Sequence, residues 1–278
     1  MEIITDITSL RLRLKSEHFV VLVPTMGNLH EGHLSLIQIA KQKSGCLVAS
    51  IFVNRLQFEQ TSDFDQYPRT LTDDFKLLEN YGVDVVFVPT EKDIYPVRQE
   101  FLIEPLPLAN ILEGEFRPGF FRGVATLVLK LFNLVQPQLA IFGKKDYQQL
   151  CIIREMVRQL NLPIEIDVGE TVRASDGLAL SSRNRYLNNE ERAEAARLFQ
   201  VLSKIKQEIE TGNRNFKKLQ DTARETLVSR GWNVDYIALR QGDTLAPVQV
   251  NDRDQIVLGA AKLGTTRLID NLEISAGI

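Results

Sequence analysis

Two of the three histidines in this 278-residue chain stand three positions apart, at His30 and His33. They follow an apolar run at 19–23 and a small-residue turn at 24–27, where a helix is expected to begin. Side chains three apart on a helix share one face, and the first turn of a helix offers backbone N–H groups and a favourable dipole to an anion. Each imidazole can add a hydrogen bond. The sequence therefore predicts a phosphate site near the amino terminus.

Two other interpretations of this pair stay open. The histidines could make local hydrogen bonds only, or they could bind zinc. Zinc needs three or four ligands, and the usual helical pair is spaced i, i+4. The remaining histidine is His18, and Cys46 and Cys151 lie in apolar segments. Both cysteines are expected in the core of a protein from a reducing compartment, so zinc is the weaker interpretation.

Polar side chains also follow the next apolar run, at Asn54 and Gln57. The Gln57 amide offers an acceptor and two donors to a substrate that carries hydroxyl and carboxylate groups. An acidic pair, Asp73 and Asp74, stands near the start of a predicted helix. Stabilisation of that helix start is the simpler role, and contact with a phosphate-bound Mg²⁺ is the alternative.

Two later segments have the same character. After Gly143, which permits close backbone approach, the chain carries Lys144, Lys145 and Asp146, and then Gln149 one turn into a helix. Beyond the last strand of this part, hydroxyls and a guanidinium form an oxyanion cradle at residues 181–183. Either segment alone is also typical of a plain polar loop.

The helices and strands that must position these residues can be predicted, because short apolar runs typical of strands alternate with segments that have a helical period. Strands alternating with helices predict an α/β, Rossmann-like parallel sheet over residues 1–174, with ligands bound beyond the carboxyl ends of the strands. His30, Asn54, Gly143 and Val172 all follow strand ends and should converge. The predicted strands are 19–23, 47–53, 83–88, 139–142 and 164–168, and the helices lie near 34–43, 70–81, 123–135 and 146–160.

The pattern changes near residue 175 and predicts a smaller α+β domain over 175–278, which we expect to act as a lid. One long helix opens at 188–191 with acidic residues in its first turn. The other expected elements are a helix at 216–230 and strands at 234–240, 255–260 and 266–269.

Bulk properties exclude several classes. The formal charge of −3 gives no reason to expect nucleic-acid binding. The sequence contains no run of about 18 uncharged apolar residues, so no membrane-spanning helix is expected, and no secretory signal is visible. A cytoplasmic protein is expected.

Taken in order, the motifs resemble the pantothenate synthetase (pantoate–β-alanine ligase) family. His-x-Gly-His alone indicates only the wider nucleotidyltransferase-like group. The ordered set is more specific and spans the chain, most strongly the first 190 residues. The matching segments are 24–33, 52–54 with 57–58, 65–70, 121–124, 143–149 and 181–187.

The resemblance implies a two-step ligation that consumes ATP with Mg²⁺, joins (R)-pantoate to β-alanine through a pantoyl adenylate, and is usually carried out by a homodimer. It implies that His33 is a proton donor, supported by His30 and Lys145, and that Gln57, Gln149, Met26 and Asn54 bind the organic substrates. The implied ATP contacts are Met26, Gly27, Asn28, Leu29, His30, Glu31, Gly32, His33, Gly143, Lys144, Lys145, Asp146, Val172, Leu180, Ser181, Ser182 and Arg183.

The chain departs from the family pattern at four positions. Arg55 replaces a usual Pro, so the loop that carries Gln57 is expected to be less rigid. Lys144 replaces a common Glu and adds charge, Leu180 replaces Met, and Phe120 replaces His. None removes a group on which the implied chemistry depends. Two competing functions are a nucleotidyltransferase that leaves the nucleotide on its product and a catalytically silent nucleotide-binding protein.

Overall fold

A computed structural model describes residues 1–58, 61–105 and 107–275. Its backbone contacts divide the chain into two compact units, Met1–Lys144 with Ile152–Glu170, and Lys145–Cys151 with Thr171–Ile278. The sequence prediction placed the short segment 145–151 in the first domain. The contacts group it with the second unit, because Asn271 and Glu273 bind residues in it.

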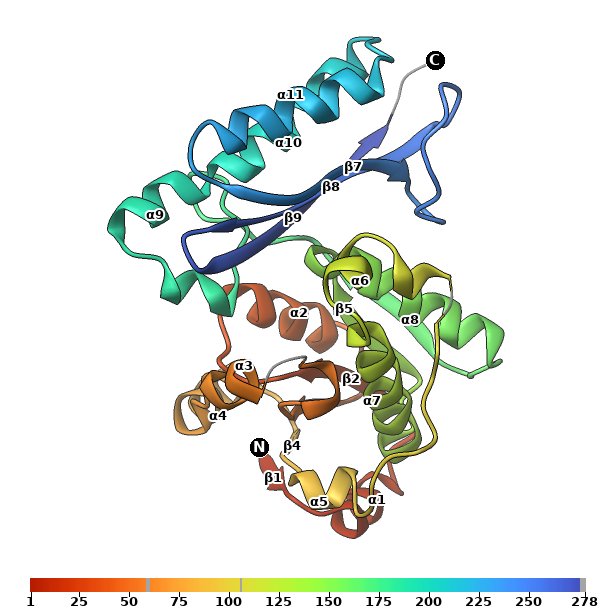
Figure 1. Cartoon of the computed structure of the whole chain (residues 1–278). Coiled ribbons are helices and arrows are strands. Elements are labelled where there is room, and N and C mark those ends of the chain that lie inside the picture. The colour runs from red at the N-terminus through yellow and green to blue at the C-terminus, as the bar shows by residue number, and fades with distance from the viewer. Residues whose placement is uncertain (59–60, 106, 276–278) are drawn as a thin grey trace. The chain divides into compact units, whose positions relative to one another are not determined.

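The first unit contains a six-stranded sheet in the order β1-β4-β3-β2-β5-β6, and every pairing is parallel (Figure 1). The predicted Rossmann-like class is confirmed. The chain order reverses between β2 and β5, and in such sheets ligands bind at this switch point, beyond the carboxyl ends of the strands. The strands are β1 (Glu2–Ile4), β2 (Val20–Thr25), β3 (Cys46–Ile51), β4 (Val85–Phe87), β5 (Leu139–Gly143) and β6 (Glu165–Gly169).

Helices connect these strands. They are α1 (Ile7–Leu14), α2 (Glu31–Lys41), α3 (Thr61–Gln66), α4 (Leu71–Asn80), α5 (Glu91–Ile94), α6 (Glu113–Phe116), α7 (Phe120–Val135) and α8 (Tyr147–Gln159), with short 3₁₀ turns η1 (Arg55–Gln57), η2 (Leu108–Asn110) and η3 (Lys144–Asp146). Sequence patterns had predicted the longer helices. The short edge strand β1 and the short helices between β3 and α7 carry too few residues for a clear period.

Both faces of the parallel sheet are covered, because neighbouring residues of a strand point to opposite sides. On β5, Ile141 lies in a buried cluster with Ile37 of α2 and Leu78 of α4. The next residue, Phe142, packs its ring against Phe132 of α7 at 6.5 Å between centroids. Burial on both faces explains why the strands are continuous runs of apolar residues rather than alternating ones.

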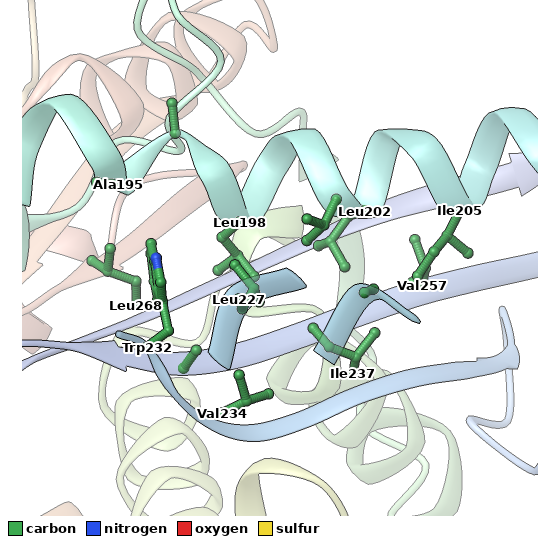
Figure 2. Packing of buried hydrophobic residues seen from close by; sticks show 14 of the residues in the cluster. Ala195, Leu198, Leu202, Ile205, Leu227, Trp232, Val234, Ile237, Val257 and Leu268 are labelled. Carbon is green, nitrogen blue, oxygen red and sulfur yellow. The ribbon is translucent and has the colours of Figure 1, made fainter. Parts of the chain in front are cut away.

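The second unit contains an antiparallel sheet, β7 (Asn233–Gln241), β8 (Asp254–Leu263) and β9 (Thr266–Ser275), with α10 (Arg197–Glu210) and α11 (Phe216–Val228) along one face. Figure 2 shows Leu198, Leu202 and Ile205 of α10 packed over Ile237 and Val257. Each fully buried aliphatic side chain of this kind contributes about 1.5–3 kcal/mol. The predicted α+β composition is confirmed.

One predicted helix is divided in two. The long helix expected from residue 188 ends after α9 (Asn189–Ala195), and α10 begins at Arg197. Ala196, which separates them, keeps helical backbone angles. The apolar period continues across the break, which is why the sequence did not reveal it.

Cys46 and Cys151 are both buried, as predicted. Among the described residues, no helix is both long and apolar enough to cross a membrane.

Candidate active site

The turn after β2 is held by a buried carboxylate. Gly27 and Asn28 both adopt positive φ, at 76° and 51°. The Asp74 carboxylate, on α4, accepts the backbone N–H groups of Asn28 at 3.0 Å and Leu29 at 2.8 Å, and the Thr70 hydroxyl at 3.1 Å. Asp74 is 1% exposed. Its carboxylate therefore fixes the left-handed turn that leads into the histidine pair.

The two histidines form a reciprocal cap at the start of α2. His30 Nδ1 accepts the N–H of Gly32 at 3.1 Å, and His33 Nδ1 accepts the N–H of His30 at 3.3 Å. Because a backbone N–H can only donate, both Nδ1 atoms are unprotonated acceptors. Each neutral ring then carries its proton on Nε2. The rings lie 4.1 Å apart between centroids, so two Nε2–H donors stand side by side at a helix start.

This arrangement shows the local hydrogen bonds of the first interpretation, and the phosphate interpretation stays a prediction. The histidines do make local hydrogen bonds, which involve Nδ1 of each ring. The Nε2–H groups, the dipole of α2 and the backbone of the turn suit a phosphate oxygen rather than a metal, which needs a lone pair. Glu31 follows in the first turn, where an acidic residue suits the dipole.

The next strand, β3, leads to a second polar cluster. Asn54 is 0% exposed, and its Nδ2 donates to Gln57 Oε1 at 3.1 Å and to the Gly123 carbonyl at 3.1 Å. Gln57 Nε2 donates to Met26 Sδ at 3.2 Å. Asn54 was predicted as a substrate ligand; the structure buries it and bonds it to Gln57, and the assignment stays a prediction.

Met26 also lines a cavity of ≈ 220 Å³ within the first unit. Its walls are mostly apolar and come from the ends of β2 and β3 and from the segment before α4. Polar groups enter at Arg69, Thr70, Asp74 and Glu91. A pocket with apolar walls and few polar groups is the usual form of a small-molecule site.

The acidic pair offers little to a metal directly. Both oxygens of Asp74 are engaged by backbone and hydroxyl donors, and Asp73 is exposed with Lys76 at 3.5 Å. Among the described residues, no group of three or more His, Cys, Asp or Glu side chains could hold a metal ion. This donor set fits a Mg²⁺ whose ligands are mainly phosphate oxygens and water.

Gly143 ends β5 at the switch point, and the two lysines that follow it belong to different units. Lys144 pairs with Glu170 at 2.6 Å, so its extra charge is balanced within the first unit. The Lys145 backbone carbonyl accepts Asn271 Nδ2 at 2.9 Å, and its ammonium lies 4.0 Å from the exposed Asp146 carboxylate. Lys145 is thus anchored to β9.

The other predicted nucleotide contacts lie in the second unit. Leu180 donates its N–H to the Val172 carbonyl at 2.9 Å, which brings those two residues together. The Ser181 hydroxyl accepts the N–H of Arg183 at 3.3 Å and caps the 3₁₀ turn η4 (Ser182–Tyr186). Gln149 is half-buried on α8.

A buried ion pair lies beside the segment 172–180. Arg173 donates to both oxygens of Asp270 at 2.6 and 2.8 Å, and also to the Gly177 carbonyl at 3.1 Å. Its guanidinium stacks over Phe199 at 4.4 Å. Burial raises the pKa of Asp270, while the Arg173 guanidinium opposes that rise. Neither residue was singled out in the sequence, because the partners are 97 positions apart.

Two departures from the family pattern are compensated locally. Arg55, expected to loosen its loop, pairs with Glu91 at 3.0 Å and lies over the Phe64 ring at 4.0 Å. Phe120 is buried with the Arg117 guanidinium 3.6 Å from its ring centroid. At both positions the side chain is held by cation–π contact.

The parallel sheet, its switch point and the histidine cap define a nucleotide-binding α/β protein of the Rossmann type. Comparison with known proteins refines this class, because the pantoate-beta-alanine ligase family matches residues 2–273. The chain belongs to the pantoate–β-alanine ligase family and is an enzyme of that type. The resemblance inferred from the ordered motifs is confirmed.

Relatives named pantothenate synthetase include one from Nitrosospira multiformis, 66% identical over 99% of both chains, and one from Nitrosomonas europaea, 59% identical over 98% of both. The pantothenate synthetase structure from Thermus thermophilus is similar with a TM-score of 0.94 and 40% identity, covering 99% of this chain and 100% of that one. The pantoate-beta-alanine ligase from Francisella tularensis has a TM-score of 0.82 and 36% identity over 98% and 97%; it is described as complexed with beta-gamma ATP and β-alanine.

The predicted site residues thus form two groups. The first unit holds Met26, Gly27, Asn28, Leu29, His30, Glu31, Gly32, His33, Asn54, Gln57, Asp73, Asp74, Gly143 and Lys144, and the second holds Lys145, Asp146, Gln149, Val172, Leu180, Ser181, Ser182 and Arg183. Sequence reasoning missed three residues that hold these groups in place: Tyr95, Arg173 and Asn271. No local motif marks them.

Proposed function

We propose that the chain condenses (R)-pantoate with β-alanine in two steps. In the first, a carboxylate oxygen of pantoate attacks the α-phosphorus of ATP and pyrophosphate leaves. In the second, the amine of β-alanine attacks the acyl carbon of the pantoyl adenylate, loses a proton, and AMP leaves. The products are pantothenate, AMP and pyrophosphate.

The observation that carries this proposal is the pair of Nε2–H donors at the start of α2. Both steps move negative charge among phosphate oxygens, so preorganised donors matter more than a protein nucleophile. His33 and His30 hold protons at Nε2 because their Nδ1 atoms accept backbone N–H groups. We assign His33 as the hydrogen-bond donor to the phosphate oxygens that gain negative charge when the leaving phosphate group departs.

The remaining residues bind and orient. Gln57, Met26 and Gln149 are assigned to the organic substrates, because carboxamides bind pantoate without adding a charge that would weaken its carboxylate as a nucleophile. Lys145, Ser182 and Arg183 are assigned to the nucleotide phosphates. Holding two small molecules in line with a nucleotide raises the reaction rate, because the reactants are already oriented.

Mg²⁺ is proposed to accompany the triphosphate. When bound there, the ion would neutralise charge on the phosphates. Asp73 and Asp74 are the acidic residues that the sequence offers for this ion. Because the Asp74 carboxylate is engaged in the turn, we assign both residues at most a contact with the ion through water or phosphate.

Two further properties are proposed. A homodimer is supported by a run of exposed apolar side chains, with Val97 76%, Phe101 89% and Leu102 40% exposed. Sedimentation of wild type and of Phe101→Asp would test this, and the variant is expected to sediment as a smaller species. Two buried cysteines suit a cytoplasmic enzyme.

The central experiment is a pyrophosphate-release assay in which each substrate is omitted in turn. Release is expected to require pantoate, and AMP is expected to appear with pantothenate only when β-alanine is present. Equal release without pantoate would refute the proposal. AMP retained in the final product, detected by mass spectrometry, would favour a nucleotidyltransferase instead.

A His33→Ala variant tests the residue that carries the proposal. Turnover is expected to fall roughly 10²-fold or more. His18→Ala is the matched control, because His18 is exposed and lies before β2 rather than in the cap of α2. Unchanged turnover in His33→Ala would refute the assignment of His33.

A further inference from the structure

We propose that Tyr95 and Asn54 together determine which end of the Gln57 carboxamide faces the acid substrate, which makes Tyr95 a positioning residue for the ligation. This inference rests on the proposed function, in which Gln57 binds pantoate. It concerns three side chains from two segments of the first unit, joined by two side-chain hydrogen bonds.

The orientation of Asn54 is fixed by groups that cannot change their role. Its Nδ2 faces the carbonyl of Gly123 at 3.1 Å, and a carbonyl can only accept. Its Oδ1 faces the backbone N–H of Leu56 at 3.3 Å, and an N–H can only donate. A rotation of the amide by 180° would oppose donor to donor and acceptor to acceptor at a residue that is 0% exposed.

Gln57 inherits its orientation from Asn54. Since the amide nitrogen of Asn54 points at Gln57, the atom that meets it must be the carboxamide oxygen, at 3.1 Å. The NH₂ group of Gln57 then points to Met26 Sδ at 3.2 Å, which is a weak acceptor. Met26 lines the ≈ 220 Å³ cavity. Under the proposed function, oxygen acceptors of the organic acid replace the thioether as the partner of that NH₂ group.

Tyr95 supplies the other end of this chain of contacts. Its hydroxyl donates to Asn54 Oδ1 at 2.8 Å, a shorter bond than the one from Leu56. Burial raises the pKa of Tyr95 well above its ordinary value, so the hydroxyl keeps its proton at any working pH. The ring is held by Phe52 at 6.1 Å and by the Lys130 ammonium at 5.0 Å.

A constant arrangement of donors matters because the substrate is an acid. If Asn54 moved or rotated, Gln57 could present its oxygen to a carboxylate and repel it. A net hydrogen bond of this kind changes a binding equilibrium about 2- to 12-fold. The effect should appear in pantoate binding and leave ATP binding unchanged, since none of the three side chains belongs to the residues assigned to the nucleotide.

Tyr95→Phe removes only the hydroxyl and is the main test. We expect the KM for pantoate to rise about 2- to 12-fold while the KM for ATP and the melting temperature change little. Tyr81→Phe is the matched control: Tyr81 packs against the buried cluster around β3 and is expected to leave both KM values unchanged.

Asn54→Asp tests the orientation itself. The substituted carboxylate would present an oxygen to Gln57, whose NH₂ group would then turn toward it and leave Oε1 facing the substrate. Asn54→Ala removes the partner without imposing that rotation. Pantoate KM should therefore rise more in Asn54→Asp than in Asn54→Ala. If Asn54→Asp does not fold, as judged by circular dichroism, the Tyr95→Phe comparison alone decides.

Two outcomes overturn the inference: a Tyr95→Phe enzyme with wild-type pantoate KM, or one in which pantoate and ATP KM rise equally, which would indicate a general structural role. Both require active wild-type enzyme. A wild type without pantoate-dependent turnover would instead refute the proposed function, so the two failures are distinguishable.

Discussion

The Asp74 carboxylate accepts the backbone N–H of Leu29 at 2.8 Å, across 45 positions of sequence. The same carboxylate binds the N–H of Asn28, so two successive amides of the turn before the histidine pair point inward at one side chain. Asp74, which the sequence offered as a helix-start acid or a metal contact, supports the turn that precedes the histidine pair.

Asp74→Asn is therefore expected to damage both stability and nucleotide binding. The amide keeps one acceptor but turns an NH₂ group toward a backbone N–H or the Thr70 hydroxyl. Hydrogen bonds to charged groups contribute about 1.5–3 kcal/mol, and a loss of that order is expected in urea unfolding. ATP KM should rise as well. Asp73→Asn, at the exposed neighbour, should change neither quantity, and equal effects at both positions would contradict this account.

Helix α7 approaches the turn that carries Gln57 so closely that Gly123 has no room for a side chain. A Cβ at Gly123 would lie 2.3 Å from the Leu56 carbonyl oxygen and 2.7 Å from the Gln57 nitrogen. Both are backbone atoms, so the turn itself would have to move.

Gly123→Ala should then lower pantoate-dependent kcat/KM by about 10²-fold, because small misplacements of binding groups are costly in rate. The gain in helix propensity, about 1 kcal/mol, would not restore activity. Arg122→Ala changes the exposed neighbour on the same helix and should retain activity. Wild-type kcat/KM in Gly123→Ala would show that the close approach is unimportant.

Asn271 of β9 fixes the backbone of Lys145 through a 2.9 Å hydrogen bond to its carbonyl. Asn271→Ala removes this donor, and Asn271→Asp removes it while keeping the size of the side chain. If Lys145 binds phosphate, both variants should raise the dissociation constant for ATP by about 10-fold through misplacement of the ammonium. Isothermal titration with a non-hydrolysable ATP analogue measures this directly. A folded Asn271→Ala protein with wild-type affinity for the analogue would show that Asn271 does not position Lys145 for ATP binding.

The candidate site residues that the sequence singled out are those marked by their immediate neighbours in the chain. His30 and His33 were recognisable because a turn, a helix start and two imidazoles lie within ten residues. The parallel sheet was recognisable because strands buried on both faces are unbroken apolar runs. Gln57 was recognisable as a polar residue directly after such a run.

The supporting residues could not be found in this way, because their partners are remote in sequence. Tyr95 reaches Asn54 across 41 positions, and Asn271 reaches Lys145 across 126. Each is a single polar residue in an ordinary strand or loop, and only the folded backbone brings the partners together. The same reason explains why the segment 145–151 groups with the second unit rather than with the sheet that precedes it.

Glu194 makes the stability of the second unit depend on pH. On α9, its carboxylate accepts two hydrogen bonds of 2.6 Å from Arg230 and one of 3.3 Å from the indole of Trp232. The Arg230 bonds, followed by the smaller contribution of Trp232, lower the pKa of Glu194 below its ordinary value of 4.5. A carboxyl whose folded pKa is lowered stabilises the fold above its unfolded pKa and loses that contribution as the pH falls through the folded value.

Wild type should therefore exceed Glu194→Gln in free energy of unfolding at neutral pH, and the difference should shrink as the pH falls below about 4.5. Trp232 is the only tryptophan in the chain and lies in the core of this unit, so its fluorescence during urea titration reports the transition. Glu225→Gln, at an exposed position on α11 of the same unit, should follow wild type throughout. If the free energies of unfolding of wild type and Glu194→Gln, plotted against pH, stay parallel from pH about 7 to about 3, the ion pair with Arg230 does not control acid stability.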